Sequence, residues 1–319
     1  MCWFHGEHGV GDVYRGRELG TDEVIRFLRE VAPSRPSIYF GGAEPLMRTD
    51  FPEIAGLAAG LGMAVGFTTN ALLLAPEISR RLLEGGLDRV NFSVDGPPDV
   101  HDRLRGEGTF ARAMENIRAF LEVRGRGSAR PVRATVNVTV NPLVAGRLVE
   151  TVAALRDATG DRIDEYRVHH LWFVEPERLR AHERAVEAAL GCSAAGAAAH
   201  LLPHSYHIDV SELSRETDIL RGQPKVVFFP RLHGRALAAF YSAEQPARAR
   251  CTAPWRSVLV KPDGAVRFCP DEWIDGFELG TVRESKLADL WTSADAGRFR
   301  RALAAAGTFP ACKRCSWLR

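Results

Sequence analysis

The sequence lacks the features that would direct the chain to a membrane or to nucleic acid. Its formal net charge is only +2, so no strong electric field attracts it to polyanions or to acidic lipids. Its longest apolar stretch, residues 54–67, is interrupted by glycines and is shorter than the roughly 20 residues that span a bilayer. The first residues contain no apolar signal region. We therefore expect a cytoplasmic protein with no nucleic-acid or membrane partner.

Cysteine is also scarce, with 6 residues in 319, yet four of them lie close to the C-terminus. Seventeen residues separate Cys251 from Cys269, and two separate Cys312 from Cys315. Thiols stay reduced in the cytoplasm, where spaced cysteines bind metal more often than they form disulfides. Four thiolates can enclose a tetrahedral zinc ion or an iron–sulfur cluster, and spacing alone does not separate these two. Cys192 lies in a run of small residues and is expected to be a buried, inert thiol.

The first half of the chain alternates between strand-like and helix-like patterns. Apolar or β-branched runs predict strands at 37–40, 64–68, 89–94, 131–140 and 166–173. Helical spacing and helix punctuation predict helices at 51–61, 76–84, 110–123 and 144–158. This alternation is typical of βαβ units around a parallel sheet, whose ligands bind at the carboxyl ends of the strands. Glycine and polar residues gather at those ends, at 41–44, 68–70, 93–95 and 141.

The remainder of the chain divides into two further parts. Residues 175–245 begin as a charged helix, and we expect a connecting or inserted region that could complete the α/β part. Residues 246–319 are expected to form a small α+β domain with the four cysteines. Within it, Pro262-Asp263-Gly264 lies between two strand-like runs and predicts a hairpin that brings Cys251 and Cys269 together. The predicted division is therefore 1–174, 175–245 and 246–319.

Four segments of the first part follow one another in an informative order. They are Ile38–Leu46 (IYFGGAEPL), Thr68–Ala71 (TTNA), Asn91–Gly96 (NFSVDG), and His101–Arg103 with Arg105–Gly106. A single glycine-rich turn is weak evidence, because a plain turn explains it. Taken together, the segments resemble the radical SAM superfamily over most of residues 1–170. The resemblance implies that residues 1–174 form a partial (β/α)6 TIM-like barrel, with its first strand missing, which binds S-adenosylmethionine (SAM) and a [4Fe–4S] cluster.

The resemblance also assigns SAM contacts to the strand ends, namely Gly41, Gly42, Glu44, Asn70, Ser93, Asp95 and Arg105. Gly41, Gly42 and Glu44 would contact the methionine amino group, and Ser93 and Asp95 would lie where the ribose is bound. Arg105 would pair with the methionine carboxylate, since a guanidinium matches its shape, although a solvated surface arginine is an equally good interpretation. Asn137 and Asn141 lie near the end of the strand predicted at 131–140, which is the fifth if the missing first strand is counted. They would face the adenine.

The C-terminal cysteines fit the same resemblance. The pattern Cys251-x12-Gly264-x4-Cys269, followed by Cys312-x2-Cys315, is similar to the twitch domain of this superfamily, a shorter relative of the SPASM domain. It implies an auxiliary [4Fe–4S] cluster bound by all four cysteines, which would serve electron transfer or structural support. After Cys315 we find no ligands for a second auxiliary cluster.

The N-terminus departs from the superfamily's C-x3-C-x-φ-C motif, whose three thiolates bind the SAM-activating cluster. Cys2 fits the third cysteine, so the first two cysteines and the first strand would lie before residue 1. Either a start codon placed too late or a real deletion explains this, and we favour the first because the other segments look intact. Cys2 is then the one catalytic cluster ligand that we can assign.

By resemblance, we expect an enzyme in which the cluster reduces SAM to a 5′-deoxyadenosyl radical that abstracts hydrogen from a peptide or small metabolite. Flavodoxin or ferredoxin would donate the electron. Two alternatives stay open: a truncated, catalytically inactive radical SAM homologue, and a zinc-binding interaction protein with an α/β domain. The histidines could line a substrate pocket, but such residues are more often structural; they are His169, His170, His204 and His207.

Overall fold

The computed structural model describes residues 14, 16–125, 131–202, 206–242, 250–315 and 318. Contacts divide the chain into two compact units. The sheet unit comprises Val24–Leu171 and His207–Tyr241, and the cysteine unit comprises Met1–Glu23, Trp172–Tyr206 and Ser242–Arg319. Contacts thus divide the chain differently from the three consecutive segments expected from the sequence. Residues 172–206 belong with the cysteines, whereas 207–241 return to the sheet.

The sheet unit is built on six parallel strands that pair in chain order. They are β1 (Ser37–Phe40), β2 (Ala64–Thr69), β3 (Arg89–Ser93), β4 (Arg133–Thr139), β5 (Glu165–His169) and β6 (Val226–Phe229). The expected parallel α/β fold is therefore confirmed. Five strands lie where the sequence predicts them. The sixth comes from an apolar run inside the region predicted to be a connection, because Val227 pairs with Arg167 of β5.

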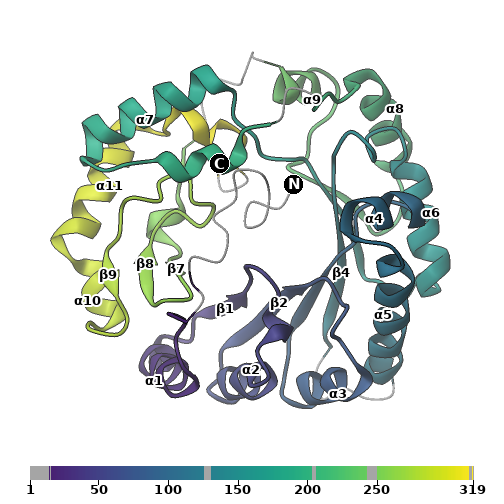
Figure 1. Ribbon diagram of the computed structural model, residues 1–319, viewed down its shortest axis with the longest axis horizontal. Helices are drawn as coiled ribbons and strands as arrows, with labels where there is room; N and C mark the ends of the chain where they lie inside the picture. The colour runs from purple at the N-terminus through teal and green to yellow at the C-terminus, as the bar shows by residue number, and fades with distance from the viewer. Residues whose placement is uncertain are drawn as a thin grey trace. The chain divides into compact units, whose positions relative to one another are not determined.

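Helices cover one face of this sheet (Figure 1). They are α1 (Thr21–Val31), α2 (Phe51–Gly60), α3 (Pro76–Glu84), α4 (Pro98–Arg105), α5 (Thr109–Gly125), α6 (Leu148–Thr159), α8 (Val210–Leu220) and α9 (Gly234–Tyr241), with 3-10 turns η1 (Ala32–Ser34) and η2 (Pro45–Met47). Helix α6 begins four residues later than predicted. The amides of Val144 and Ala145 bond to the carbonyl of Asn141 at 3.0 and 2.9 Å, and this turn occupies the expected first turn of the helix.

The strands present alternate side chains to two different environments, as a pleated sheet requires. Phe67 packs on Phe51 of α2 with ring centroids 5.1 Å apart, and Phe92 packs on Phe120 of α5 at 5.6 Å. These aromatic residues are fully buried and mark the helix-covered outer face, where the core lies. The alternating positions therefore point to the opposite, inner face. That face is polar, and Tyr39 on it is 44% exposed.

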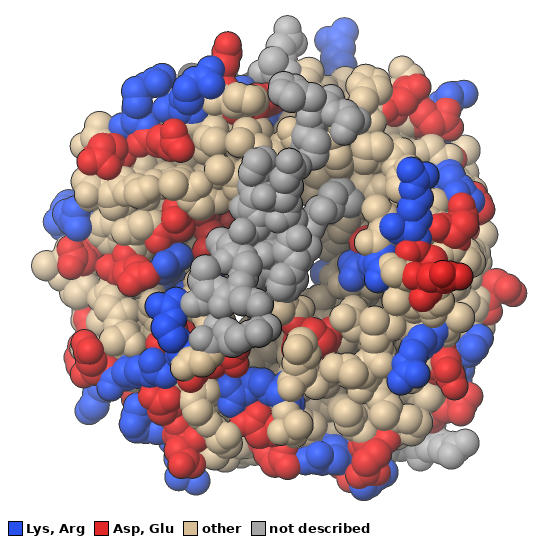
Figure 2. Space-filling view, in the orientation of Figure 1, with Lys and Arg blue, Asp and Glu red and all other residues tan. Residues whose placement is uncertain are grey.

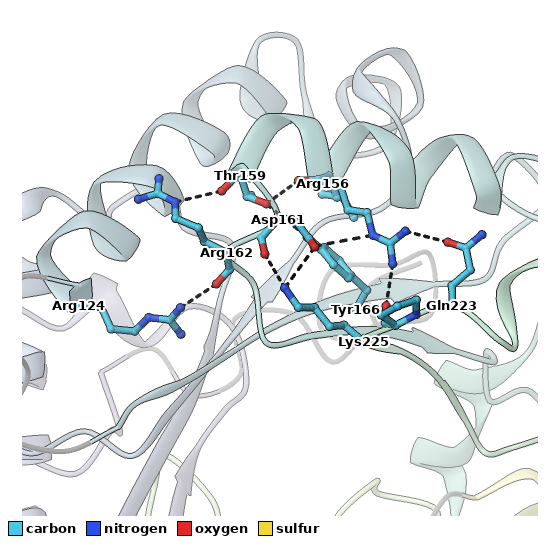
Figure 3. Close-up of polar contacts among 10 residues, drawn as sticks. Arg124, Arg156, Thr159, Asp161, Arg162, Tyr166, Gln223 and Lys225 are labelled. Atoms are coloured by element: carbon cyan, nitrogen blue, oxygen red, sulfur yellow. Dashed lines mark hydrogen bonds and ion pairs between the residues drawn. The ribbon is translucent and has the colours of Figure 1, made fainter.

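A polar cluster joins the turn before β5 to the turn before β6 (Figure 3). Arg156 donates to Gln223 Oε1 at 2.8 Å and to the Pro224 carbonyl at 2.7 Å. Lys225 Nζ donates to the Asp161 carbonyl at 2.5 Å. These contacts lie at the amino ends of the strands, opposite the edge where ligands bind in parallel α/β proteins. We interpret them as contacts that hold the fold together.

The cysteine unit combines helices with a three-stranded antiparallel sheet, in the order β7 (Leu259–Val260), β8 (Ala265–Arg267) and β9 (Gly280–Thr281). Its other elements are α7 (Pro176–Leu190), η3 (Ala195–His200), η4 (Ala253–Trp255), α10 (Leu287–Thr292), α11 (Ala294–Ala306) and η5 (Pro310–Arg314). The predicted hairpin is confirmed. Gly264 closes the hairpin turn with φ +90°, a conformation that L side chains rarely adopt.

The surface carries charges of both signs. On the face shown in Figure 2, acidic and basic side chains are interspersed, in keeping with the small net charge. Among the described residues, none of the helices combines the length and the apolar character needed to cross a membrane.

Candidate functional site

The first candidate site lies at the carboxyl ends of β1 and β2, around Glu44. Its Oε1 accepts hydrogen bonds from the Leu46 amide at 3.2 Å and from the Thr69 hydroxyl at 2.9 Å. Its Oε2 accepts the amide of Asn70 at 2.7 Å. The carboxylate therefore joins the two strand ends and brings two predicted site residues, Glu44 and Asn70, into contact.

The turn that carries Glu44 needs its glycine. Gly42 has φ +116°, which lies in the range that glycine adopts without strain. The next residues, Pro45–Met47, form η2, whose cap is the Glu44 side chain. The glycine-rich segment thus directs a fixed carboxylate to the sheet edge.

Asp95 is the centre of the neighbouring strand ends. Its Oδ2 accepts from Arg105 Nε and Nη2, at 2.9 and 2.8 Å, and its Oδ1 accepts the Thr139 amide at 3.0 Å. The side chain is largely buried, with 7% of the residue exposed. Two residues to which the sequence assigned separate SAM contacts, Asp95 and Arg105, therefore form one ion pair. Ser93 ends β3 beside them and pairs in register with Asn137 of β4.

His101 supports this ion pair from α4. Its Nδ1 accepts the Asp95 amide at 3.1 Å, so the ring is neutral and its proton is on Nε2. Burial, with the charge of Arg105 as a second cause, lowers the pKa of His101 to about 4. The sequence placed His101 in a family segment but did not assign it a contact.

The residues predicted to face adenine differ in what they bind. Asn141 is buried, and its side-chain amide bonds within its own turn, to the Thr139 carbonyl and the Leu143 amide. Asn137 Oδ1 lies 3.3 Å from Nε2 of His169 on β5. Burial lowers the pKa of His169 to about 4, so it is neutral at physiological pH.

His170 faces the opposite side of the sheet. Its Nδ1 lies 2.9 Å from the Tyr241 hydroxyl, among the rings of Phe228 and Phe240. His207 lies just before α8. His204 and Cys2 lie outside the described residues, so the roles predicted for them stay predictions.

The second candidate site is a cavity in the cysteine unit. All four C-terminal cysteines line it, and its remaining lining is apolar: Ala253, Pro254, Phe268, Pro270, Trp273, Ile274, Phe299, Leu303 and Leu318. None of the four forms a disulfide bond. In the part of the chain that the structure describes, no three histidine, cysteine or acidic side chains converge as ligands of a single metal ion. The four thiols instead line the cavity from different sides.

The backbone around Cys269 is arranged for a negative sulfur. The amides of Asp271, Trp273 and Ile274 are directed at the thiol and favour its ionised form, yet burial dominates and raises the pKa to about 12. Burial also raises the pKa of Cys251 and Cys312. These thiols are protonated unless a positive metal centre replaces the proton, which is typical of cysteine ligands before metal binding.

An acidic residue, Asp271, contacts one of the cysteines that line this cavity. The Cys315 thiol donates to its Oδ2 at 3.2 Å. Burial raises the pKa of Asp271 to about 7. The sequence did not indicate this residue, because it lies in no motif considered there.

Two histidines fix the loops that carry the cysteines. His182 of α7 lies with Nε2 2.5 Å from the Trp273 carbonyl, and its Nδ1 accepts the Ala311 amide at 3.3 Å. It therefore joins the loop after Cys269 to the residue before Cys312. His200 of η3 lies 3.0 Å from the Asp271 carbonyl and stacks on Trp273, with ring centroids 3.9 Å apart.

Arg314 holds the C-x-x-C loop from inside. Its guanidinium donates to the Phe173 carbonyl at 3.1 Å, to Glu175 Oε1 at 2.6 Å and to the Ser242 carbonyl at 3.0 Å. The arginine is nearly fully buried, at 2% exposure. Residues 172–206, which the sequence left without a role, thus supply most of the support for the cysteine loops.

Comparison with known proteins gives a match to each of the two parts of the chain that carry these sites. The family model of the radical SAM superfamily matches residues 1–136, and that of an iron–sulfur cluster-binding domain, SPASM, matches residues 251–316. The second match contains all four cysteines of the cavity. The chain therefore contains a radical SAM domain and a SPASM domain. Its C-terminal domain is of the SPASM type, and the cofactors of this domain pair are [4Fe–4S] clusters and SAM.

Relatives of this radical SAM protein cover it to different extents. Fe-coproporphyrin III synthase of Methanosarcina barkeri is 26% identical, over 96% of this chain and 75% of that protein. PqqA peptide cyclase of Granulibacter bethesdensis is 25% identical, over 88% and 67%. AdoMet-dependent heme synthase of Methanosarcina barkeri is 41% identical, but over only 31% of this chain and 30% of that protein.

Solved structures show the same fold. The structure of anSMEcpe with bound AdoMet aligns with a TM-score of 0.61 at 14% identity, over 94% of this radical SAM protein and 77% of that chain. Streptococcus suis SuiB bound to S-adenosylmethionine aligns with a TM-score of 0.61 at 15% identity, over 92% and 64%. At these identities the likeness concerns the fold alone.

The cavity residues fit an iron–sulfur cluster. Four thiols that form no disulfide line one otherwise apolar space, and backbone amides are directed at the sulfur of Cys269. Thiolate ligands, amide donors to sulfur and an apolar surround are the features by which proteins bind such clusters and adjust their potentials.

Proposed function

We propose that this radical SAM protein is an enzyme that abstracts hydrogen from an organic substrate. When bound, a reduced [4Fe–4S] cluster and SAM supply this chemistry, by forming a 5′-deoxyadenosyl radical. The observation that carries the proposal is the convergence of the predicted SAM contacts at one sheet edge. Glu44 contacts Asn70, and Asp95 contacts Arg105, on adjacent strand ends.

Each of these residues would have a defined task. Glu44, held by the Asn70 amide at 2.7 Å, would accept hydrogen bonds from the ammonium group of SAM. Gly41 and Gly42 would let the backbone approach that group. Ser93 and Asp95 would bind the ribose hydroxyls. Arg105, held by its hydrogen bond to Asp95, would form an ion pair with the methionine carboxylate of SAM.

The cysteine unit would hold the auxiliary cluster. Cys251, Cys269, Cys312 and Cys315 would be its four ligands, since all four line the same cavity. With four protein ligands, the cluster would have no open position, which favours electron transfer or structural support over substrate binding. Reduced flavodoxin or ferredoxin would be the electron donor.

Two substrate classes remain for the proposed enzyme. Fe-coproporphyrin III synthase and PqqA peptide cyclase both align along most of this chain, and their names point to a small tetrapyrrole and to a peptide. Both classes agree with hydrogen abstraction from an unactivated carbon. We therefore propose a peptide or a small metabolite as the substrate.

Anaerobic reconstitution tests the proposal. The protein is loaded with iron and sulfide, reduced with dithionite and incubated with SAM, and 5′-deoxyadenosine is measured by mass spectrometry. Formation that depends on Glu44 and Asp95 would support the proposal, and candidate peptides or porphyrin precursors would then be added as substrates. Absence of 5′-deoxyadenosine at full iron content would contradict it.

Metal analysis of the same sample examines the ligand sets. Iron and sulfide near four per chain indicate one [4Fe–4S] cluster, and values near eight indicate two. Because Cys2 is the one assigned ligand of the SAM-activating cluster, values near four would mean that only the auxiliary cluster forms. Zinc without iron would favour the zinc-binding alternative.

A further inference from the structure

Three arginines on adjacent strands point onto the inner face of the sheet. Arg89 of β3 pairs in register with Arg133 of β4, and Arg167 of β5 pairs with Asn137 of β4. All three alternate along their strands with outer-face residues that the helices bury, such as Val90, Ala134 and Val168. We call the three side chains the guanidinium face.

Among the residues that the structure describes, one carboxylate pairs with these three cations. Glu165 accepts from Arg133 Nη2 at 2.5 Å and from Arg167 Nε at 2.6 Å. Arg89 donates to the Ser37 hydroxyl at 2.8 Å, and in the described part of the chain it pairs with no carboxylate. Three guanidinium groups against one carboxylate leave an excess of two positive charges. Like charges that face each other across strands destabilise a sheet unless an anion joins them.

Other acids near the strand starts are already engaged. Asp88 accepts the Val65 amide at 2.7 Å, and Asp164 accepts the Ala134 amide at 2.7 Å and Arg124 Nη1. Both act as caps of the sheet's amino end. They do not balance the charge of Arg89, and they leave Arg133 and Arg167 to share the one carboxylate of Glu165.

Tyr39 of β1 lies close enough to two of these cations for their charges to act on its hydroxyl group. The positive charges of both Arg89 and Arg167 lower the pKa of its phenol, against a larger increase caused by burial. Asn91 donates to the phenol oxygen at 2.5 Å, which holds the ring in place, and Arg89 lies over this ring at 5.5 Å. The side chains of Asn91 and Arg89 on the inner face are therefore held in place around the ring of Tyr39.

The side chain of Arg89 passes over Gly66 of β2, where the absence of a side chain leaves space for it. A Cβ at that position would lie 2.5 Å from Cγ and 2.6 Å from Nε of Arg89. Any side chain there would push the guanidinium away from Ser37 and Tyr39. Glycine weakens a strand interior and is found where another group must approach the backbone closely.

We propose that the guanidinium face binds an oxyanion, a carboxylate or phosphate group of the substrate, between Arg89 and Arg167. Guanidinium groups pair with both anions through two parallel hydrogen bonds. Arg167 lies two residues before His169, which pairs with Thr139, whose amide binds Asp95. At about 3.3 Å per residue, the anion would sit roughly 7 Å or more below the SAM edge. The assignment of this anion to the substrate rests on the proposed function, whereas anion binding itself does not.

The test is calorimetric titration of the full chain, without SAM, at constant ionic strength. The probes are tricarballylate, which carries three carboxylates, inorganic phosphate, and the neutral triamide of tricarballylate. We expect one or both anions to bind and the triamide not to bind. Arg89→Gln with Arg167→Gln should weaken binding roughly 100-fold, at about tenfold for each charge-assisted contact.

Two further variants separate site binding from general charge effects. Arg112→Gln with Arg118→Gln removes the same two charges from α5 on the outer face, where these side chains contact the carbonyls of Leu72 and Ala158. This control should bind as the wild type does. Gly66→Ala keeps every charge but displaces Arg89, and should weaken binding roughly tenfold.

The outcomes are distinct. Equal losses in the inner-face and outer-face double variants, or no binding of either anion to the wild type, would overturn the proposal. Binding of tricarballylate alone identifies a carboxylate site, and binding of phosphate alone a phosphate site. Since 5′-deoxyadenosine formation by the wild type is measured separately, failure of the proposed function and failure of the anion site can be told apart.

Discussion

Arg105 donates from both Nε and Nη2 to one oxygen of Asp95, at 2.9 and 2.8 Å. The two residues are ten positions apart, on α4 and just after β3. The other Asp95 oxygen binds the Thr139 amide of β4. The pair therefore connects two strand ends and a helix at the edge where SAM is proposed to bind, and a change in either residue alters the position of the other.

Replacement of Asp95 by Asn should weaken SAM binding about tenfold, because the amide keeps the shape but loses the charge that holds Arg105. Equilibrium dialysis of labelled SAM measures this on reconstituted protein. Arg105→Lys should have a smaller effect, since a lysine retains the charge without the planar fork. Unchanged affinity in Asp95→Asn would show that this ion pair lies outside the SAM site.

Replacement of His182 by Leu should lower the free energy of unfolding by roughly 2–4 kcal/mol. The leucine would leave the Trp273 carbonyl and the Ala311 amide buried without a partner. Urea denaturation of the apoprotein measures the change. Iron retention should fall too, because these groups lie on the two loops that carry Cys269 and Cys312.

His182→Gln is the matched control for that experiment. Its side-chain amide offers one donor and one acceptor, so it can replace at least one of the two contacts and should recover part of the stability. If His182→Leu and His182→Gln lower the free energy of unfolding equally, the His182 ring contributes through packing and its two hydrogen bonds do not contribute.

Replacement of Arg314 by Met should reduce cluster retention severalfold and shift the auxiliary cluster to a more negative midpoint potential. A buried positive charge beside the C-x-x-C loop stabilises the more negative, reduced cluster. Redox titration followed by electron paramagnetic resonance measures the potential. Lys313→Met, in the same loop but exposed, removes the same charge and should leave the potential nearly unchanged. Equal shifts in the two variants would contradict this role for Arg314.

The stability of the protein should decrease as the pH falls from 6.5 towards 4. The pKa of His101 is about 4 in the folded protein, against 6.5 for an ordinary histidine, so the unfolded chain binds the proton first. The stabilisation is present above pH 6.5 and is lost as the pH approaches 4. Melting temperatures at pH 7 and pH 5 should therefore differ less in His101→Gln than in the wild type. A variant with the same difference would show that His101 does not titrate in this window.

His169 and His170 contribute to the slope in that experiment in the same direction. Burial lowers the pKa of both to about 4, so they favour the folded state over the same pH interval as His101. The His101 variant should consequently flatten the pH dependence without abolishing it.

The strands and most helices could be predicted because their signals are local. Ser37–Phe40 and Pro76–Glu84 have the bounds that apolar runs and helix punctuation indicate. Val226–Phe229 was left without a role, since a four-residue apolar run acquires its meaning only by pairing with β5. The inner-face arginines were also missed. Alternation along β3 and β5 was their signal, but which face would be left free of helices is not a local property.

The sequence by itself determined the family, the parallel α/β fold and the two groups of candidate ligands, because spaced motifs and hydrophobic periods are written along the chain. Only the tertiary structure decided how these groups are held. His182 and Arg314 make contacts that span 129 and 141 positions, and Arg89 lies over a glycine of the neighbouring strand. Such contacts depend on which surfaces meet after packing, and no local pattern specifies them.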